Sequence, residues 1–346
     1  METAHAAALA PPGWWQRYRL RLKRRRLLWR SLRSRHQLRV VADRSAVIKA
    51  QDILGFVVLR NESARLPYFL DYYRALGVKH FLVVDNGSND GSAEFLTDQP
   101  DVSLWQTRAS YREARFGLNW STWLQMRYGH GLWCLTVDAD ELLVYDGIEE
   151  HDLSDLTARL GQQGLPGFGA MMLDLYPRGA LGDQPYAPGQ DPLEVLNWFD
   201  AGPYRATRQS PMGNLWLQGG TRERVFFAAR PERSPTLNKI PLVKWNRRYA
   251  YVNSTHSLLP PDLNRLYAGP GGTEPAGVLL HTKFLPEIVS KSATEKQRQQ
   301  HFHTPQAFDH YYDDLSTAPD LWQEHAQKYK GPAQLCALGL MPELRW

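Results

Sequence analysis

Three carboxylates lie close together at Asp138, Asp140 and Glu141, directly after the short apolar run 133–137. The run has the length of a buried strand and is too short to span a membrane. Side chains alternate along a strand, so we expect Asp138 and Asp140 on one side and Glu141 turned away. Carboxylates at this range raise one another's pKa unless a cation lies among them. The motif therefore favours a divalent metal ion, with solvated acids or caps of a following helix as the alternative.

The elements before the acidic motif alternate between strand and helix. Residues 52–59 and 80–85 are apolar runs of strand length, and the segment between them has apolar side chains at helical spacing. This order predicts a βαβ unit in an α/β fold. Ligands of such sheets bind beyond the carboxyl ends of the strands, where Asn61, Asp85 and Asp90 fall.

The alternation continues up to the acidic motif and loosens after residue 146. Neither a Walker-type phosphate loop nor a Gly-x-Gly-x-x-Gly fingerprint occurs, so NTP hydrolysis and dinucleotide redox chemistry are not indicated. The further elements that we expect are helices at 65–77, 92–96, 111–128, 152–162 and 287–303 and within 306–346, strands at 102–105, 169–175, 225–227, 249–252 and 278–281, and a long loop at 176–214.

The composition is that of a folded protein with one large domain or two modest ones. The chain has 346 residues, of which 43% are apolar and 22% charged. Cys134 and Cys336 are its two cysteines, so the sequence implies no disulfide framework and favours an intracellular, cytoplasmic location.

Basic charge is concentrated near the N-terminus. Residues 1–50 hold 13 Lys or Arg against two acids, whereas the other 296 residues hold 28 bases and 34 acids. Residues 13–39 alternate Arg and Lys with Trp and Leu, which predicts an interfacial helix on an anionic membrane, at the inner face of the cytoplasmic membrane. Charge alone would also suit a nucleic-acid arm or a solvated helix. The aromatic residues favour the membrane, and we expect no nucleic-acid partner.

Four motifs occur in order along the first half of the chain: Arg60-Asn61-Glu62, Val84 to Ser92, Ala114 to Asn119 and Asp138 to Glu141. Taken together, they resemble the nucleotide-sugar half of GT-A glycosyltransferases, in particular the bacterial family 2 group. The resemblance covers about residues 52–146. A later segment, 279–284, resembles a subgroup of these transferases and, more distantly, family 92 enzymes.

The resemblance implies a role for each matching residue. Asp85 would accept a hydrogen bond from the base of a uracil nucleotide, Asp90 would hold the ribose, and Asn61 and Glu62 would border the nucleoside. Arg115 and Asn119, four apart on the expected helix, would contact the diphosphate. The metal, Mn²⁺ or Mg²⁺, would be bound by Asp138, Asp140 and His281, with Asp138 also near the ribose and Lys283 near a phosphate. An imidazole ligand favours Mn²⁺.

The chain departs from the family pattern in two places. Asn86 stands where the family has a second acid, and the Glu-Asp pair that marks the catalytic base does not occur. Asp174, Glu223 and His256 are the candidate bases, and for each a structural role is the alternative.

The resemblance and the residues together predict an α/β, GT-A (Rossmann-like) domain with a mixed central sheet at 51–285. A basic amphipathic arm at 1–50 would precede it and a helical extension at 286–346 would follow. The expected function is metal-dependent, inverting transfer of a sugar, as in surface polysaccharide or glycolipid synthesis. The donor would be a nucleotide-sugar, with UDP favoured, and the acceptor a carbohydrate or a lipid-linked sugar. A nucleotidyltransferase and a non-enzymatic binding module at a membrane surface remain alternatives.

Overall fold

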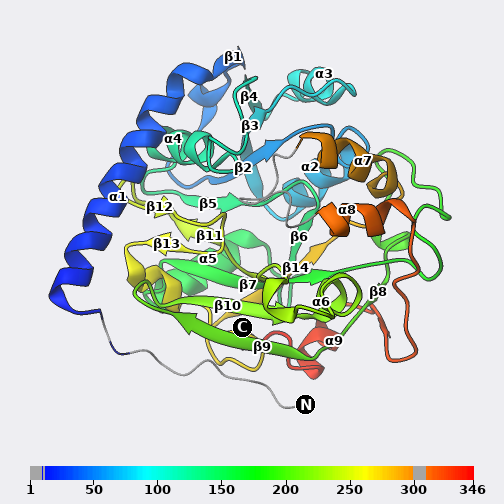
Figure 1. Cartoon of the computed structure of the whole chain (residues 1–346). Coiled ribbons are helices and arrows are strands. Elements are labelled where there is room, and N and C mark those ends of the chain that lie inside the picture. Colours follow the sequence, from blue (N-terminus) through cyan, green and yellow to red (C-terminus); the bar gives the residue numbers. More distant parts are fainter. Residues whose placement is uncertain (1–9, 11, 299–308) are drawn as a thin grey trace.

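A mixed nine-stranded sheet runs through the centre of the molecule (Figure 1). The computed structural model describes residue 10 and residues 12–298 and 309–346. From one edge to the other, the strands are β1 (Arg39–Ala42), β4 (Val102–Gln106), β3 (Val78–Asp85), β2 (Ile53–Leu59), β5 (Trp133–Thr136), β11 (Asn238–Lys244), β7 (Gly167–Asp174), β14 (Ala276–His281) and β6 (Glu141–Val144).

Most of these strands end at the same edge of the sheet. Strands β4, β3, β2 and β5 are parallel, and β11 is antiparallel to both β5 and β7. Strand β7 therefore has the direction of β5, and β14 is parallel to β7. The chain adds β3 on one side of β2 and β5 on the other, so the strand order reverses at β2. Such a switch point is where ligands bind in open α/β sheets.

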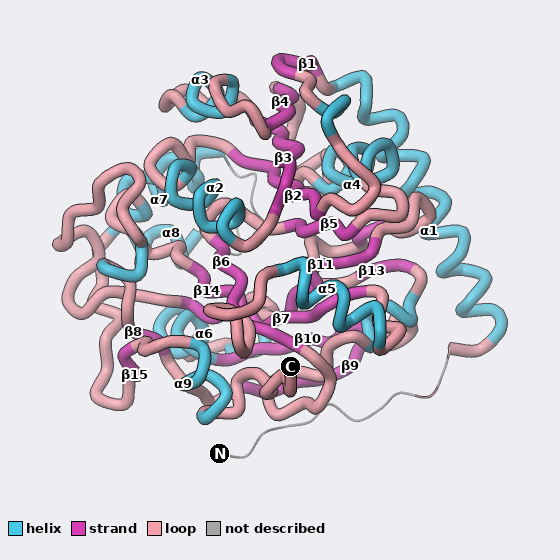
Figure 2. Tube along the Cα trace, turned by 180° about the vertical axis from the view of Figure 1, so that it is seen from behind, coloured by secondary structure: helices cyan, strands magenta, loops and turns pink. Residues whose placement is uncertain are grey.

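Helices cover both faces of the sheet (Figure 2). Strand β2 directs Val57 and Leu59 into a core with α2 (Leu66–Ala75) and α5 (Leu153–Gln162). It directs Leu54 and Phe56 into a core with α4 (Leu118–Tyr128), as strand alternation requires. The helices are α1 (Trp14–Ser34), α2 (Leu66–Ala75), α3 (Ser92–Thr97), α4 (Leu118–Tyr128), α5 (Leu153–Gln162), α6 (Gly220–Phe226), α7 (Ile288–Arg298), α8 (Asp309–Ser316) and α9 (Pro332–Ala337).

Small sheets and single turns complete the chain. The paired strands are β9 (Tyr204–Gln209) with β10 (Asn214–Gly219), β12 (Ala250–Tyr251) with β13 (Leu258–Leu259), and β15 (Gln327–Lys328) with β8 (Trp198–Phe199). The 3₁₀ turns are Arg35–Gln37, Ser45–Val47, Pro192–Glu194, Pro231–Arg233 and Pro261–Arg265.

The predicted α/β class, with a mixed central sheet, an N-terminal helix and helices near the C-terminus, is confirmed. Among the described residues, no helix has the length and apolar character needed to cross a bilayer. The domain boundaries at 50 and 285 remain predictions, although β1, from the expected arm, pairs with β4 in the sheet. Residues 1–9, 11 and 299–308, which the expected arm and extension include, lie outside the described residues.

Three local predictions were wrong, and strand β11 was missed. Residues 225–226 end helix α6 instead of forming a strand, and the expected loop 176–214 contains β8 and β9. Helix α4 begins at Leu118, because Arg115 and Phe116 have φ values of 58° and 56°, which an α-helix does not allow. Strand β11 was not predicted, since Pro241 suggests an edge or a loop, but the pairing with β7 is irregular between residues 239 and 242 and accommodates it.

Candidate functional site

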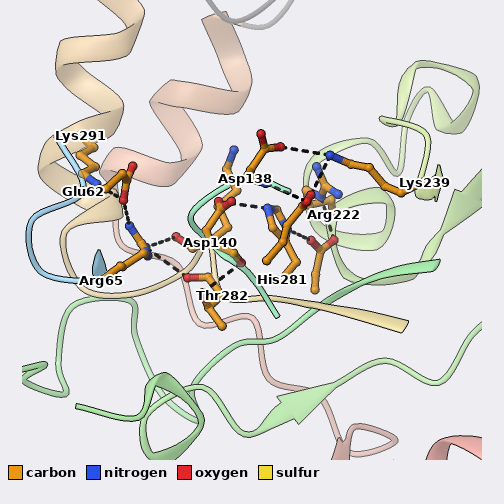
Figure 3. Close-up of polar contacts among 12 residues, drawn as sticks. Glu62, Arg65, Asp138, Asp140, Arg222, Lys239, His281, Thr282 and Lys291 are labelled. Carbon is orange, nitrogen blue, oxygen red and sulfur yellow. Dashed lines mark hydrogen bonds and ion pairs between the residues drawn. The ribbon is translucent and has the colours of Figure 1, made fainter. Parts of the chain in front are cut away.

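Ionisable side chains from five strands meet at the carboxyl edge of the sheet (Figure 3). Their positions follow from the strand directions, because the parallel strands end here and the antiparallel strands begin here. The residues are Asp138 and Asp140 after β5, Glu141 at the start of β6, Asp174 at the end of β7, Lys239 near the start of β11 and His281 at the end of β14.

Lys239 is a buried cation among the acids of the 138–141 motif. Its Nζ lies 2.7 Å from Glu141 Oε1 and 3.1 Å from Asp138 Oδ2. The Glu141 side chain is 1% exposed, whereas that of Asp138 is 52% exposed and reaches solvent. The repulsion that favoured a metal in the sequence is therefore relieved in part by a lysine of the chain itself.

The charges of this pair depend on burial and on the neighbouring acids. Burial raises the pKa of Glu141 to about 7, with Asp138 and Asp140 acting in the same direction and Lys239 opposing them. Burial would lower the pKa of Lys239, but Asp138 and Glu141 outweigh it and raise that pKa. Lys239 therefore stays charged at neutral pH, and its ammonium group limits the rise in the pKa of Glu141.

His281 bridges two carboxylates in the centre of the site. Its Nε2 lies 3.2 Å from Asp140 Oδ2, and its Nδ1 lies 2.6 Å from Asp174 Oδ1. The Nε of Arg222, on α6, donates to Asp174 Oδ2 at 2.7 Å. Asp174 and Arg222 are buried, so four side chains form one continuous row of charge-assisted contacts.

This row fixes the charge of its members. Burial opposes ionisation of Asp174, but Arg222 and His281 hold its pKa down to about 2. Burial likewise opposes ionisation of Asp140, yet His281, Arg65 and Lys283 keep its pKa well below the usual range. The pKa of His281 is raised, because the two carboxylates outweigh burial. Asp174 is therefore a poor candidate base, and its contacts are those of a residue that positions His281.

A second group of ion pairs borders the site between α2 and α7. Arg65 contacts Glu62 at 2.7 Å and Glu287 at 3.1 Å, and its Nη2 donates to the carbonyl of Thr282 at 3.2 Å. Lys291 Nζ lies 3.1 Å from the same Glu62 oxygen, Oε2. The contacts connect the segment after β2 to the segment after β14, and they hold Glu62 between two cations (Figure 3).

The predicted nucleoside residues shape the turn after β3. Asp85 is fully buried and accepts from the amide of Ser88 at 3.0 Å. Asn61 Oδ1 accepts from the amide of Asn89 at 2.9 Å, and Asp90 Oδ2 accepts from the amide of Ser63 at 2.9 Å. These bonds hold the turns after β2 and β3 together at the switch point.

Arg115, one of the two predicted diphosphate residues, contacts the β12 segment. Arg115 Nη2 donates to the carbonyls of Tyr251 and Val252 at 2.6 and 3.0 Å, and burial, with a smaller effect of Arg30, lowers its pKa to about 10. Arg115 precedes α4, so it does not share a helical face with Asn119, although its Nη1 donates weakly to Asn119 Oδ1 at 3.4 Å. Arg115 thus anchors the β12 segment.

The remaining candidates have partners of their own. Lys283 Nζ lies 5.8 Å from the ring centre of Tyr311. Glu223 pairs with Arg205 and accepts from Ser234 Oγ at 2.6 Å.

His256 contacts the protein backbone. Its Nδ1 lies 2.6 Å from the carbonyl oxygen of Asn238. Burial, followed by the charge of Lys239, lowers the pKa of His256 to about 3, which is too low for a base that works at neutral pH.

Four cations of the site were missed from the sequence: Arg65, Arg222, Lys239 and Lys291. Lys239 was missed together with its strand, β11. The signal that could have found it is the pattern Lys-Ile-Pro-Leu-Val-Lys, in which alternate residues suit a strand once the proline is placed at an irregularity. Arg222 directly precedes the strand that was predicted at 225–227, but the structure places it in helix α6.

Asp140 and His281 are the two side chains of the site that could together hold a divalent cation. Among the described residues, no group of three or more His, Cys, Asp or Glu is arranged to hold a metal ion. Asp140 Oδ2 and His281 Nε2 nevertheless converge at 3.2 Å, close to the roughly 3 Å between neighbouring ligands of an octahedral ion. Asp174 accepts from the other ring nitrogen, as outer partners of metal-binding histidines do. Asp138 is engaged with Lys239 instead.

Comparison with known proteins adds the following. No protein-family model and no curated protein matches the chain. Among solved structures, 4-diphosphocytidyl-2C-methyl-D-erythritol synthase is similar over 40% of this chain and 68% of its own, with 16% identity and a TM-score of 0.25. A chain named as a glucose-1-phosphate thymidylyltransferase from Bacillus anthracis is similar over 76% and 83%, with 8% identity and a TM-score of 0.29. Both TM-scores are too low to support a functional argument.

Proposed function

We propose that the chain is a glycosyltransferase of GT-A type that binds a nucleotide-sugar and a divalent cation at the carboxyl edge of its sheet. The donor is a UDP-sugar, the acceptor is a carbohydrate or a lipid-linked sugar, and the transfer proceeds with inversion. The ordered motifs of residues 60–141 support the donor class. The acceptor class follows from the resemblance alone.

The observation that carries the proposal is the row Asp140, His281, Asp174 and Arg222 at the switch point of the sheet. A carboxylate and an imidazole face one another there, and a buried carboxylate fixes the imidazole from behind. This is the arrangement of a metal-binding histidine with its outer partner. Asp85 ends a strand of the same sheet edge, two strands away from β5.

In this proposal, each side chain of the row has a separate task. A bound cation supplies Lewis-acid stabilisation of the departing nucleoside diphosphate. Asp140 and His281 would hold it, and Asp174 would orient the His281 ring through its contact with Nδ1. Lys239 balances Asp138 and Glu141. Glu223 is the remaining candidate for the base that takes the proton of the acceptor hydroxyl, since the pKa values of Asp174 and His256 are too low for that role.

Calorimetric titration with UDP, with and without Mn²⁺, tests the site. We expect Mn²⁺ to strengthen UDP binding, and we expect Asp140→Asn to remove that effect. Asp71→Asn, which changes an exposed carboxylate on α2, is the matched control and should behave like the wild type. UDP binding that does not respond to Mn²⁺ in the wild type would contradict the proposed metal site.

The released product distinguishes the two classes of transferase. A glycosyltransferase releases a nucleoside diphosphate from the nucleotide-sugar, whereas a nucleotidyltransferase releases pyrophosphate from a nucleoside triphosphate. Pyrophosphate release from UTP and a sugar phosphate would replace the proposal with the nucleotidyltransferase alternative. The absence of binding to any nucleotide would favour the binding module.

A further inference from the structure

Helix α1 has a buried stripe and an exposed apolar stripe on opposite sides. At about 100° per residue, Leu20, Leu27, Ser31 and Ser34 fall within an arc of about 60°, and these four residues are buried. They pack toward α4 and toward the β12 and β13 strands, where Leu20 and Leu27 join a cluster with Met212, Ala250 and Leu259.

The second stripe faces away from the protein. Trp14, Trp15, Tyr18, Leu22 and Trp29 fall within an arc of about 100° whose centre lies about 180° from that of the buried arc. Trp14, Trp15 and Trp29 are 68%, 67% and 59% exposed, so the fold gives them little cover. In Figure 1 the helix lies along one side of the molecule. Large exposed apolar side chains gathered in one stripe mark a surface that binds a partner.

Basic side chains surround this stripe. Helix α1 contains nine Arg or Lys and no acid. Arg25 lies within the exposed arc, and Arg21 and Arg26 lie at its two margins by the same 100° spacing, all three exposed. Trp and Leu side chains suit the apolar acyl-chain region of a bilayer, and the arginines beside them suit its anionic headgroups.

We infer that the outer face of α1 docks the protein on an anionic lipid surface, with the helix parallel to the membrane plane. The inner face is already packed, so docking needs no rearrangement of the fold. The Nη2 of Arg30 donates to the carbonyl of Glu113, and Ser34 Oγ donates to the carbonyl of Asn119, so the docked helix stays attached to the segment that enters α4. The inference does not depend on the proposed transferase activity.

Vesicle flotation of the full chain tests the inference. The vesicles contain phosphatidylcholine alone or with about one-third phosphatidylglycerol. The two test variants are W14S/W15S/W29S and R21Q/R25Q/R26Q. Two single changes at exposed sites outside α1 are the matched controls, Val47→Ser for the apolar stripe and Lys330→Gln for the charges. Urea unfolding of every variant identifies any that fails to fold.

We expect the wild type and both controls to float with the anionic vesicles and not with the neutral ones. Removal of three arginines should weaken binding about a hundredfold, since each basic residue near the surface contributes a factor of about five. Removal of the three tryptophans should weaken it at least tenfold and abolish quenching of tryptophan fluorescence by lipids brominated in their acyl chains.

Two results would overturn the inference. The first is equal flotation of W14S/W15S/W29S and the wild type, which would mean that the stripe does not insert. The second is tight binding to a single-stranded RNA that the tryptophan variant loses, without bromolipid quenching in the wild type. That result would assign the same face to base stacking on nucleic acid.

Discussion

Replacing Lys239 with methionine tests whether the lysine is the internal counter-ion of the acidic motif. Glu141 is 1% exposed and has Lys239 as its ion-pair partner at 2.7 Å. Methionine keeps most of the side-chain volume but leaves this carboxylate without that partner. Breaking a buried pair on one side costs about 3–5 kcal/mol of the free energy of unfolding. Asp138 adds little, because half of its side chain reaches water.

The loss should depend on pH, and its sign follows from linkage. Burial already raises the pKa of Glu141 to about 7 with Lys239 present, and removal of the lysine raises it further. A carboxyl group whose pKa is raised in the folded state favours folding below its unfolded pKa and loses that advantage as pH rises through the folded pKa. Lys239→Met should therefore cost most at about pH 8 and much less at pH 5, where Glu141 can take a proton.

The measurement is urea unfolding of the wild type, Lys239→Met, Glu141→Gln and the double variant at both pH values. The double variant has no buried carboxylate at 141, so it should recover most of the stability that Lys239→Met loses at pH 8. An unchanged urea midpoint for Lys239→Met at pH 8, or a loss that is equal at the two pH values, would refute the counter-ion role.

Three further predictions concern other parts of the chain. Asp174→Asn should weaken Mn²⁺ binding by about 10- to 100-fold in calorimetry, because the outer partner of His281 loses its charge; equal affinity would reject its positioning role. His256 should by itself lower the free energy of unfolding by about 1–2 kcal/mol between pH 6.5 and 5, because its depressed pKa makes the folded state resist protonation, and the difference in urea midpoint between the wild type and His256→Gln should show this loss. Leu27→Ala should cost about 2–4 kcal/mol, while Trp29→Ser should stay within about 0.5 kcal/mol, and similar losses for the two would mean that α1 does not pack as described.

Local patterns predicted the first half of the fold well. The strands β2 and β3 and the helix α2 between them follow from apolar spacing and turn residues. Each strand buries a continuous run of apolar side chains, and the helix buries apolar side chains at helical spacing. The second half was harder, since β11 combines a buried lysine with a proline, both of which are typical of exposed or irregular segments. Only the pairing of β11 with β5 and β7 explains its burial, and pairing between distant segments is not visible in a local pattern.

The same difference explains which site residues were predicted. Acids at strand ends are visible from the sequence, because the carboxyl edge of a parallel sheet can be inferred without knowing the strand order. The cations that face them come from the N-cap of α2, from α6 and α7, and from β11, and the positions of these elements depend on tertiary packing. The expected helical face shared by Arg115 and Asn119 was wrong for a local reason, since the positive φ of Arg115 places it before the start of α4.

The presence of Lys239 also changes what the acidic motif implies about a metal. Clustered carboxylates need a positive charge close by, which either a bound metal ion or a cationic side chain of the protein can supply. Here Lys239 meets that need for Glu141 and Asp138. The argument for a divalent cation therefore rests on Asp140 and His281, where two potential ligands face each other and Asp174 fixes one of them. Asp140→Asn should consequently weaken metal-dependent UDP binding far more than Asp138→Asn. Equal effects of the two changes in the UDP titration would mean that the whole acidic motif, including Asp138, binds the metal.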